Sequence, residues 1–392
     1  MSKLLWVLPR VLFPIKDGAS TANKALISPL AKTVETLDLI CFGQIENKDR
    51  ILYDEIGVGQ IFELEKKKVE TKWQKFKSFL SNLIDDVSLP LTAGSFISSK
   101  NDTKVKMVLQ NKYDSIIFDG LHPFILFRNF NLANKIVYRA HNVEQDLWAG
   151  AMERSNNLFI KFLLKWQGEK MGRLENELCR RADSIWAISP EDRHRFIELG
   201  FKDKVVLINC GMNFQKIDFE RPLREPKQLL FLGKLDWAPN RDGLVWFLEN
   251  VWCEFKLSDL HLHIVGSGHF DRMDLLGKYS NITLHGFVPD LAPLFEKCDA
   301  SIVPIHYGSG TRIKVIDCVS RGMPLISTGM GVQGSGLEIG DFVEANNRDQ
   351  WIQALSQLDS RHLRKTSKKA YERLFALYDL NQQARKAYQT ML

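Results

Sequence analysis

Hydrophobic residues in this chain fall into short, largely apolar runs that alternate with longer segments of helical periodicity. Lys3 to Leu8 and Gln228 to Leu232 are such runs, with the length and composition of strands buried on both faces of a parallel sheet. In Arg312 to Ser320 the apolar residues instead recur on one face of a helix. Strand and helix signals that alternate in this way predict an α/β protein with parallel sheets.

The alternation is present in both halves of the chain. The strands expected in the first half are Lys3–Leu8, Leu37–Phe42, Ile61–Leu64, Ser115–Phe118, Lys135–Tyr138, Ser184–Ile188 and Lys204–Ile208. The strands expected in the second half are Gln228–Leu232, His261–Val265, Ile282–Leu284 and Ser301–Ile305. Each half therefore predicts a doubly wound, Rossmann-like domain, with a cleft between the two domains.

A segment of little periodicity separates the two halves. It runs from Met212 to Lys227, and Pro222 and Pro226 stiffen it, as is typical of a linker. A length of 392 residues also suits two cores better than one. We therefore predict a first domain at 1–211, a linker at 212–227, a second domain at 228–375, and a C-terminal helix within 376–392 that packs back toward the first domain.

Composition limits the class of protein. Charged residues make up 26% of the chain and the net charge is only +6, which is typical of a globular protein and does not indicate a nucleic-acid partner. The six cysteines show no CxxC pair or metal-ligand spacing, so we expect buried thiols in a reducing compartment. No apolar run reaches the length of a membrane span. We expect a cytoplasmic chain, with attachment to the inner membrane face as a peripheral protein left open.

The stretch around Arg312 carries the strongest chemical signal. The turn Gly308-Ser309-Gly310-Thr311 joins the strand Ser301–Ile305 to the following helix, whose first N–H groups suit a phosphate. Arg312 and Lys314 stand in the first turn, where cations are unfavourable unless an anion binds. Asp317, farther along, is placed to accept hydrogen bonds from a ribose. The alternative is an ordinary strand, turn and helix of an α/β domain.

Two features of the first half also lie where α/β sheets bind ligands. A turn of small residues, Asp17-Gly18-Ala19-Ser20, follows the first strand and allows a ligand to approach the backbone, although the GxGxxG pattern is absent. His141 follows the strand Lys135–Tyr138, where an imidazole can orient a substrate hydroxyl. A structural turn and a structural histidine are the alternatives.

Two segments combine lysines with aromatic residues at helical spacing. One is Lys66 to Leu83, and the other is Phe159 to Trp166 within an expected helix at Asn157–Arg181. Such helices can lie on an anionic bilayer. They are equally typical of an amphipathic helix with solvated lysines.

Three segments together resemble a known family. Phe231-Leu232-Gly233-Lys234, His285-Gly286-Phe287-Val288-Pro289-Asp290 and the stretch Gly308 to Asp317 come in the order and spacing of the group 1, family 4-like retaining glycosyltransferases. Those enzymes have the GT-B fold. The resemblance continues in the first half through the Asp17-Gly18 turn and the stretch His141-Asn142-Val143-Glu144.

The resemblance implies roles for residues of the second domain. Gly233 and Lys234 would contact the donor diphosphate, with Arg241 as a second cation. The segment carrying Phe287 and Val288 would lie against the nucleotide base, and Asp317 would hold the ribose. The residues expected at the phosphates and the donor sugar are Ser309, Gly310, Thr311 and Arg312.

It also implies roles in the first domain and a reaction. Gly18 and Ala19 would approach the donor phosphate, and His141 would touch the transferred sugar. His141, Lys234 and Arg312 are the expected catalytic residues. They would serve transfer of a sugar, with retention, from a nucleotide diphosphate sugar to a glycan or lipid-linked acceptor in the synthesis of cell-surface polysaccharide or glycolipid. No cofactor and no metal is expected, because basic groups can stabilise the departing diphosphate.

One departure from the family pattern leaves the function open. Ser309 stands where many members carry a glutamate that contacts the donor sugar. A nucleotide-sugar-binding protein without catalysis is therefore one alternative, and a nucleotide-sugar epimerase of the same fold is another. A second departure, Ile208-Asn209-Cys210-Gly211 in place of the commoner Pro-Asn-Gly turn, is interpreted as structural.

Overall fold

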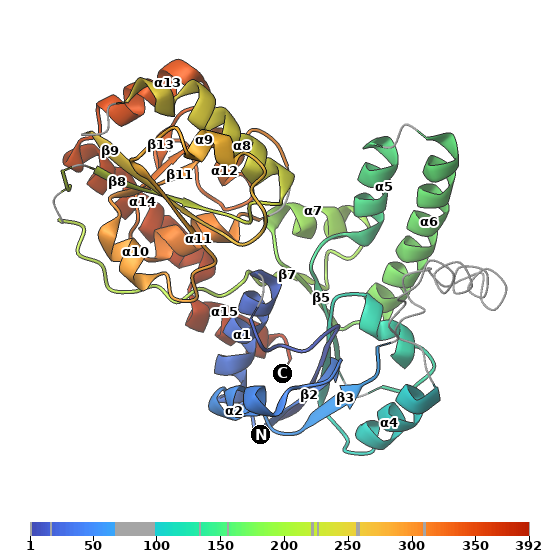
Figure 1. Cartoon of the computed structure of the whole chain (residues 1–392). Coiled ribbons are helices and arrows are strands. Elements are labelled where there is room, and N and C mark those ends of the chain that lie inside the picture. Colours follow the sequence, from blue (N-terminus) through green and yellow to red (C-terminus); the bar gives the residue numbers. More distant parts are fainter. Residues whose placement is uncertain are drawn as a thin grey trace. The chain divides into compact units, whose positions relative to one another are not determined.

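The chain forms two compact units, each described here by itself (Figure 1). The first comprises Met1–Gly211 together with Leu380–Leu392, and the second Met212–Asp379. The segment 212–227, predicted as a linker, is thus part of the second unit. The computed structural model describes residues 2–15, 18–66, 99–132, 135–154, 157–220, 223–225, 227–255, 259–308 and 311–391.

The first unit is built on a seven-stranded parallel sheet with strand order β3-β2-β1-β4-β5-β6-β7. Its strands are β1 (Lys3–Leu8), β2 (Thr36–Phe42), β3 (Ile61–Leu64), β4 (Ser115–Asp119), β5 (Lys135–Ala140), β6 (Ser184–Ala187) and β7 (Val205–Leu207). Its helices are α1 (Gly18–Ala31), α2 (Asn47–Glu55), α4 (Ser99–Leu109), η2 (His122–Phe127), α5 (Glu144–Arg154), α6 (Leu158–Arg181), α7 (Pro190–Glu198) and α15 (Leu380–Gln389).

Both faces of this sheet are buried. Along β1, Leu5 and Val7 belong to one hydrophobic core, whereas Leu4, Trp6 and Leu8 belong to another. Successive side chains of a strand point to opposite faces, so the continuous apolar runs of the sequence fill two cores rather than one.

The end of the chain completes the first unit. Helix α15 packs on α1, and Ala387 lies in the same core as Trp6. The amide of Asn209 donates to the Gln383 side-chain oxygen at 3.0 Å. A Cβ atom on Gly211 would lie 2.6 Å from the Leu380 side chain, so this position needs a glycine for the close approach of α15.

The second unit has a six-stranded parallel sheet with strand order β10-β9-β8-β11-β12-β13. Its strands are β8 (Lys227–Leu232), β9 (Leu260–Val265), β10 (Ile282–Gly286), β11 (Ala300–Val303), β12 (Leu325–Ser327) and β13 (Val343–Glu344). Its helices are α8 (Ala238–Asn250), η3 (Trp252–Glu254), α9 (Met273–Leu276), α10 (Ala292–Lys297), α11 (Ile313–Ser320), α12 (Gly329–Val332), α13 (Arg348–Ser356) and α14 (Ser360–Tyr378).

The residues after Gly211 are held against α11 and α14 within the second unit. The amide of Gln215 donates to the Ser320 carbonyl at 3.3 Å, and its carbonyl accepts from the Tyr371 hydroxyl at 2.7 Å. Phe214 packs edge-on against Tyr371, with ring centroids 5.2 Å apart. These contacts explain why the segment belongs to the second unit despite its lack of periodicity.

Candidate functional site

The loop after β8 is held close to α8 and to the loop after β9. A Cβ atom on Gly233 would lie 2.6 Å from the Asn240 amide nitrogen, and one on Gly266 would lie 1.8 Å from the Gly233 carbonyl oxygen. The Asn240 side chain donates to the Lys234 carbonyl at 3.0 Å. Glycine at 233 and 266 is therefore a packing requirement of the carboxyl edge of this sheet.

The two cations predicted in this loop, one exposed and one partly buried, both lie beside acids. Lys234 is 63% exposed, and its Nζ is 3.3 Å from Asp236 Oδ2. Arg241 Nε donates to Asp242 Oδ1 at 3.0 Å, and the Tyr307 hydroxyl donates to the other oxygen of that carboxylate. Both hydrogen bonds lower the pKa of Asp242, and the one from Tyr307 contributes most.

The start of α11 brings two more basic side chains to this edge. Arg312 is the N-cap residue and is only 5% exposed; its guanidinium lies 5.6 Å from the Trp237 ring centroid. The Lys314 Nζ donates to Asn240 Oδ1 at 2.7 Å and lies 5.3 Å from the Phe231 ring centroid. Burial lowers the pKa of Arg312 and lowers the pKa of Lys314 to about 7.

The turn before α11 is described in part. Thr311 directly precedes Arg312 and is partly buried. A Cβ atom on Gly308, which has a φ of +111°, would lie 3.3 Å from both Arg312 and Pro239. The predicted phosphate contacts Ser309 and Gly310 lie outside the described residues. The described part of the turn thus packs on the first turn of α8.

Asp317 is held by the end of its own helix. Its Oδ1 accepts from Arg321 Nε at 3.1 Å, and the Arg321 guanidinium lies 4.6 Å from the ring centroid of Phe295 on α10. An i, i+4 pair of this kind fixes one carboxylate oxygen.

The segment expected at the nucleotide base leaves β10 through a glycine with a φ of +66°, Gly286. Phe287 is 67% exposed, and Val288 is partly buried. His285 Nε2 lies 2.9 Å from Nδ1 of the buried His263, whose Nε2 is 2.9 Å from Gln228 Oε1. These two contacts fix the strand end from which Phe287 projects.

A buried polar cluster lies at the carboxyl ends of β4 and β5 in the first unit. Asp119 Oδ1 accepts from Arg139 Nη1 at 2.5 Å and lies 2.8 Å from His141 Nε2. Asn23 of α1 donates to Asp119 Oδ2 at 2.5 Å and accepts from Arg139. Because a carboxylate only accepts hydrogen bonds, His141 Nε2 carries the proton in this contact; when the ring is neutral, Nδ1 is the acceptor.

The charge of this cluster is balanced within the unit. Burial opposes ionisation of Asp119, but the charges and hydrogen bonds of His141 and Arg139 outweigh it and hold the pKa of the carboxyl below its ordinary value. His141 was predicted from the sequence. Its partners Asp119, Arg139 and Asn23 were not, although Asp119 and Arg139 stand at strand ends.

A second buried acid secures the segment that follows His141. The Glu175 carboxylate on α6 accepts from the Glu144 amide at 3.0 Å and from the Tyr138 hydroxyl at 2.9 Å. Burial, opposed by these hydrogen bonds, raises the pKa of Glu175 to about 7. The carboxylate thereby satisfies an amide at the start of α5.

The remaining first-unit candidates stand at the start of α1. The sequence predicted a turn at Asp17-Gly18-Ala19-Ser20, whereas the structure begins α1 at Gly18, so Gly18 and Ala19 form its first turn. Their backbone N–H groups lack intrahelical acceptors, as at any helix start. Asn23, one turn later, contacts Asp119, which relates Gly18 and Ala19 to the same edge of the sheet as His141.

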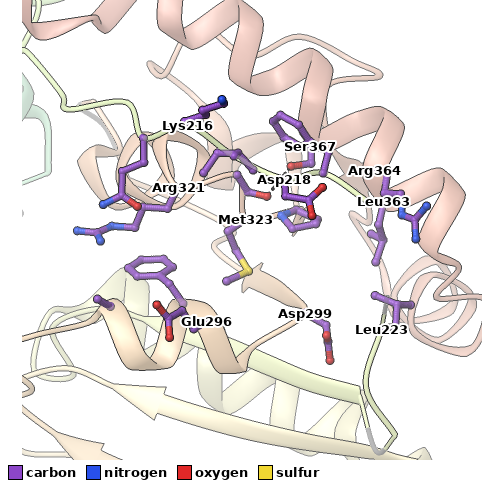
Figure 2. A pocket seen from close by; sticks show the side chains of 17 residues that line it. Lys216, Asp218, Leu223, Glu296, Asp299, Arg321, Met323, Leu363, Arg364 and Ser367 are labelled. Carbon is purple, nitrogen blue, oxygen red and sulfur yellow. Dashed lines mark hydrogen bonds between the residues drawn. The ribbon is translucent and has the colours of Figure 1, made fainter. Parts of the chain in front are cut away.

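A cavity of about 230 Å³ lies elsewhere in the second unit (Figure 2). Met323 stands in its middle, between Arg321 and Leu363. Asp299 and Pro324, which directly precede β11 and β12, also line it, so it lies at the amino ends of these strands. It is separate from Gly233 and the other residues at the carboxyl edge.

The described residues contain neither a cluster of metal ligands nor a membrane-spanning helix. Within the described ranges, no group of three or more His, Cys, Asp or Glu side chains is placed to hold a metal ion. No helix in this part of the chain combines the length and apolarity needed to cross a bilayer.

Part of the second unit matches the model of a known family. Residues 226–360 match the family model described as glycosyl transferases group 1. An uncharacterised 44.6 kDa protein in the cps region of Klebsiella pneumoniae is 21% identical over 251 residues, which cover 61% of this chain and 63% of that protein. The matched segment thus spans less than two thirds of that relative.

Solved structures are similar over the whole chain. Anabaena HepE in complex with UDP and glucose has a TM-score of 0.63 at 12% identity, covering 100% of this chain and 99% of that one. TarM, of which an S. aureus mutant is known with fondaparinux, α-GlcNAc-glycerol and UDP, has a TM-score of 0.69 at 12% identity with coverage of 100% and 99%. The predicted fold, two Rossmann-like domains in the GT-B arrangement of elements, is confirmed.

Proposed function

We propose that this chain, whose residues 226–360 form a group 1 glycosyltransferase domain, transfers a sugar from a nucleotide diphosphate sugar to an acceptor hydroxyl. The family match is the observation that carries the proposal. The matched residues include four of the predicted site residues of the second unit: Gly233, Lys234, Arg312 and Asp317.

The chemical demand of the reaction is stabilisation of negative charge on the departing diphosphate. Lys234 and Arg312 supply positive charge, and the first N–H groups of α11 supply partial positive charge. We propose that these groups act without a metal ion. Asp317 would accept the ribose hydroxyls through the oxygen that Arg321 leaves available, and Phe287 would lie against the base.

In the first unit, His141 is proposed to contact the transferred sugar. With its Nε2 proton directed to Asp119, its Nδ1 can accept a hydrogen bond from a sugar hydroxyl. The backbone of Gly18 and Ala19 would face the donor phosphate. Retention at the anomeric carbon is proposed from the family resemblance of these segments.

For the acceptor we propose a glycan or a lipid-linked sugar in cell-surface polysaccharide or glycolipid synthesis. Two observations support this: the cps region in which the Klebsiella relative is encoded, and the glycan ligands of TarM. We place the reaction in the cytoplasm, where nucleotide sugars and reduced thiols are found together; the described chain has six free cysteines.

The start of α6 supports a further proposal of contact with the inner membrane face. Leu158 is 83% exposed and Phe162 is 66% exposed, beside the exposed Lys165. The other basic aromatic segment, Lys66 to Leu83, lies outside the described residues except Lys66. If the proposal is correct, the protein sediments with anionic liposomes at low salt and the variant Phe162→Asp does not. Failure of the wild type to sediment would remove it.

A catalytically inactive nucleotide-sugar-binding protein is the second candidate, and Ser309 favours it because the family glutamate is missing there. The two candidates differ in turnover. A glycosyltransferase hydrolyses its donor slowly without an acceptor, and Lys234→Ala abolishes this, whereas a binding protein shows donor binding and no turnover with any acceptor. An epimerase would convert its donor without any acceptor.

The first experiment is a thermal-shift screen against UDP, GDP and the corresponding nucleotide sugars. A ligand at 100 times its dissociation constant stabilises the protein by about 2.7 kcal/mol, which is a measurable shift in melting temperature. Lys278→Met, on the exposed surface of the second unit, is the control that should keep the shift. No shift with any nucleotide would remove the proposed function.

A further inference from the structure

Lys314 differs in its surroundings from Lys234 and Arg241, two of the cations that the sequence assigned to the donor. Lys234 and Arg241 each lie within 3.3 Å of a carboxylate and reach solvent. For Lys314, no carboxylate lies within ion-pair distance among the residues that the structure describes. Its Nζ is held instead by the neutral side chain of Asn240, at 2.7 Å.

The groups that face Lys314 come from three elements, and none supplies a negative charge. Phe231 of β8 presents its ring, and Asn240 of α8 an amide oxygen. On α11 itself, Arg312 adds a second positive charge, and the Cys318 thiol stays neutral because burial raises its pKa to about 12. The surroundings therefore disfavour the charged ammonium.

The position of Lys314 indicates which ligand would supply the missing negative charge. The Asn240 side chain hydrogen-bonds both the Lys314 Nζ and the Lys234 carbonyl. Lys314, at the start of α11, is thereby linked to the loop after β8. This is the place where the proposed function puts the diphosphate. A cation without an acid, beside helix N–H groups, is an arrangement that an incoming anion completes.

We propose that Lys314 contacts the diphosphate of the nucleotide donor. Because the surroundings disfavour the charged amine before the anion binds, binding should bring a proton from solvent onto the amine. The proposal rests on the proposed function and assigns to the diphosphate a residue that the sequence placed near a bound anion without giving it a donor contact. In the bound state the ammonium donates hydrogen bonds to phosphate oxygens and so stabilises the charge that grows as the sugar leaves. Asn240 is the positioning residue, since it fixes the amine.

The test is calorimetric titration of UDP, and in parallel GDP, into the protein at pH 8.0, in HEPES and in Tris. At that pH the terminal phosphate of the nucleotide is ionised, so a difference in heat between the two buffers reports proton uptake by the protein. We expect the wild type and Lys278→Met to take up part of a proton. Lys314→Met should take up none and bind about 10- to 100-fold more weakly, as expected for the loss of a charge-assisted contact.

A conservative variant keeps the result interpretable if methionine disturbs folding. Lys314→Arg stays charged at every accessible pH, so it should bind UDP more tightly than Lys314→Met while taking up no proton. The pH dependence of the stability of the ligand-free protein gives a further test. The folded pKa of Lys314 is below its unfolded value, so the unfolded state binds more protons between about pH 7 and 10.5, and stability should rise with pH more steeply in the wild type than in Lys314→Met.

Two outcomes overturn the proposal and differ from each other. If neither UDP, GDP nor any nucleotide sugar binds the wild type, the proposed function fails and this inference fails with it. If a nucleotide binds with equal affinity and equal proton uptake in the wild type and Lys314→Met, the inference alone fails.

Discussion

The two units surround a basic side chain in opposite ways. In the first, the buried Arg139 is neutralised by Asp119, whose carboxylate also accepts from Asn23 and lies beside His141. In the second, the partly buried Lys314 has the uncharged Asn240 as its hydrogen-bond partner among the described residues. Arg139 thus has its counter-charge within the protein, whereas we propose that Lys314 receives one from a bound anion. A basic side chain that lacks an acid within the protein is one that a ligand can neutralise.

The largest effect is expected from removing the counter-charge of the buried Arg139. Asp119→Ala leaves the Arg139 guanidinium buried without its counter-charge, which should cost about 3–5 kcal/mol of unfolding free energy. Urea denaturation measures it. Asp236→Ala, which removes an exposed acid beside Lys234, is the control and should change stability by less than about 1 kcal/mol. A cost for Asp119→Ala no larger than the control's would contradict the view that this pair is structural.

A second prediction concerns the hydrogen-bonded chain Gln228, His263 and His285, in which a neutral His263 donates to Gln228 and accepts from His285. Burial, followed by nearby Lys297, His261 and His285, lowers the pKa of His263 to about 4, so the unfolded state binds the proton first. Stability should be fully present above about pH 6.5 and fall by roughly 2–3 kcal/mol as the pH drops toward 4.

Equilibrium unfolding at pH 7.5, 6 and 4.5 checks this second prediction. His263→Gln should flatten the dependence over that range. The same slope in both proteins would show that other groups are responsible.

A smaller effect is expected at Asn240, which joins the loop after β8 to the start of α11. Asn240→Ala removes the hydrogen bonds to the Lys234 carbonyl and to Lys314, at a cost of about 1–2 kcal/mol. Nucleotide affinity should fall as well, because Lys314 is no longer fixed. Thermal unfolding with and without UDP separates the two effects; affinity that survives a measurable loss of stability would argue against the positioning role.

The smallest effect is expected at Asp317. Arg321→Gln removes a partly buried i, i+4 pair and should change stability by only about 0.3–0.5 kcal/mol. Nucleotide affinity should nevertheless decrease a few-fold if the pair orients Asp317 toward the ribose. Binding of inorganic pyrophosphate, which has no ribose, is the internal control and should not change.

The sequence predicted the strands β1 to β11, because most of them lie in a sheet covered on both faces, which leaves an apolar run; β1 and β3 have the predicted bounds. The short strands β12 and β13 were not predicted. Helix starts were predicted less well. Helix α1 begins at Gly18, inside the expected turn, and this start was missed because its first residues are small and carry no apolar periodicity.

Side-chain pairs distant in sequence could not be predicted. Asn240 and Lys314 are 74 residues apart, and Asn23 and Asp119 are 96 apart. The family resemblance supplied Gly233, Lys234 and Asp317 as single positions. Only the folded chain shows that Asn240 fills the space opposite Gly233 and that Asp119 holds His141.

The return of α15 to the first unit sets an order for folding during synthesis. Residues 212–379 are contiguous, so the second unit can fold as soon as it has left the ribosome. The first unit, although most of it is translated earlier, lacks Ala387 and Met391 of its core until α15 has been synthesised. Its nascent form therefore keeps an apolar surface near Trp6 uncovered, which makes the docking of α15 the step that protects it from aggregation.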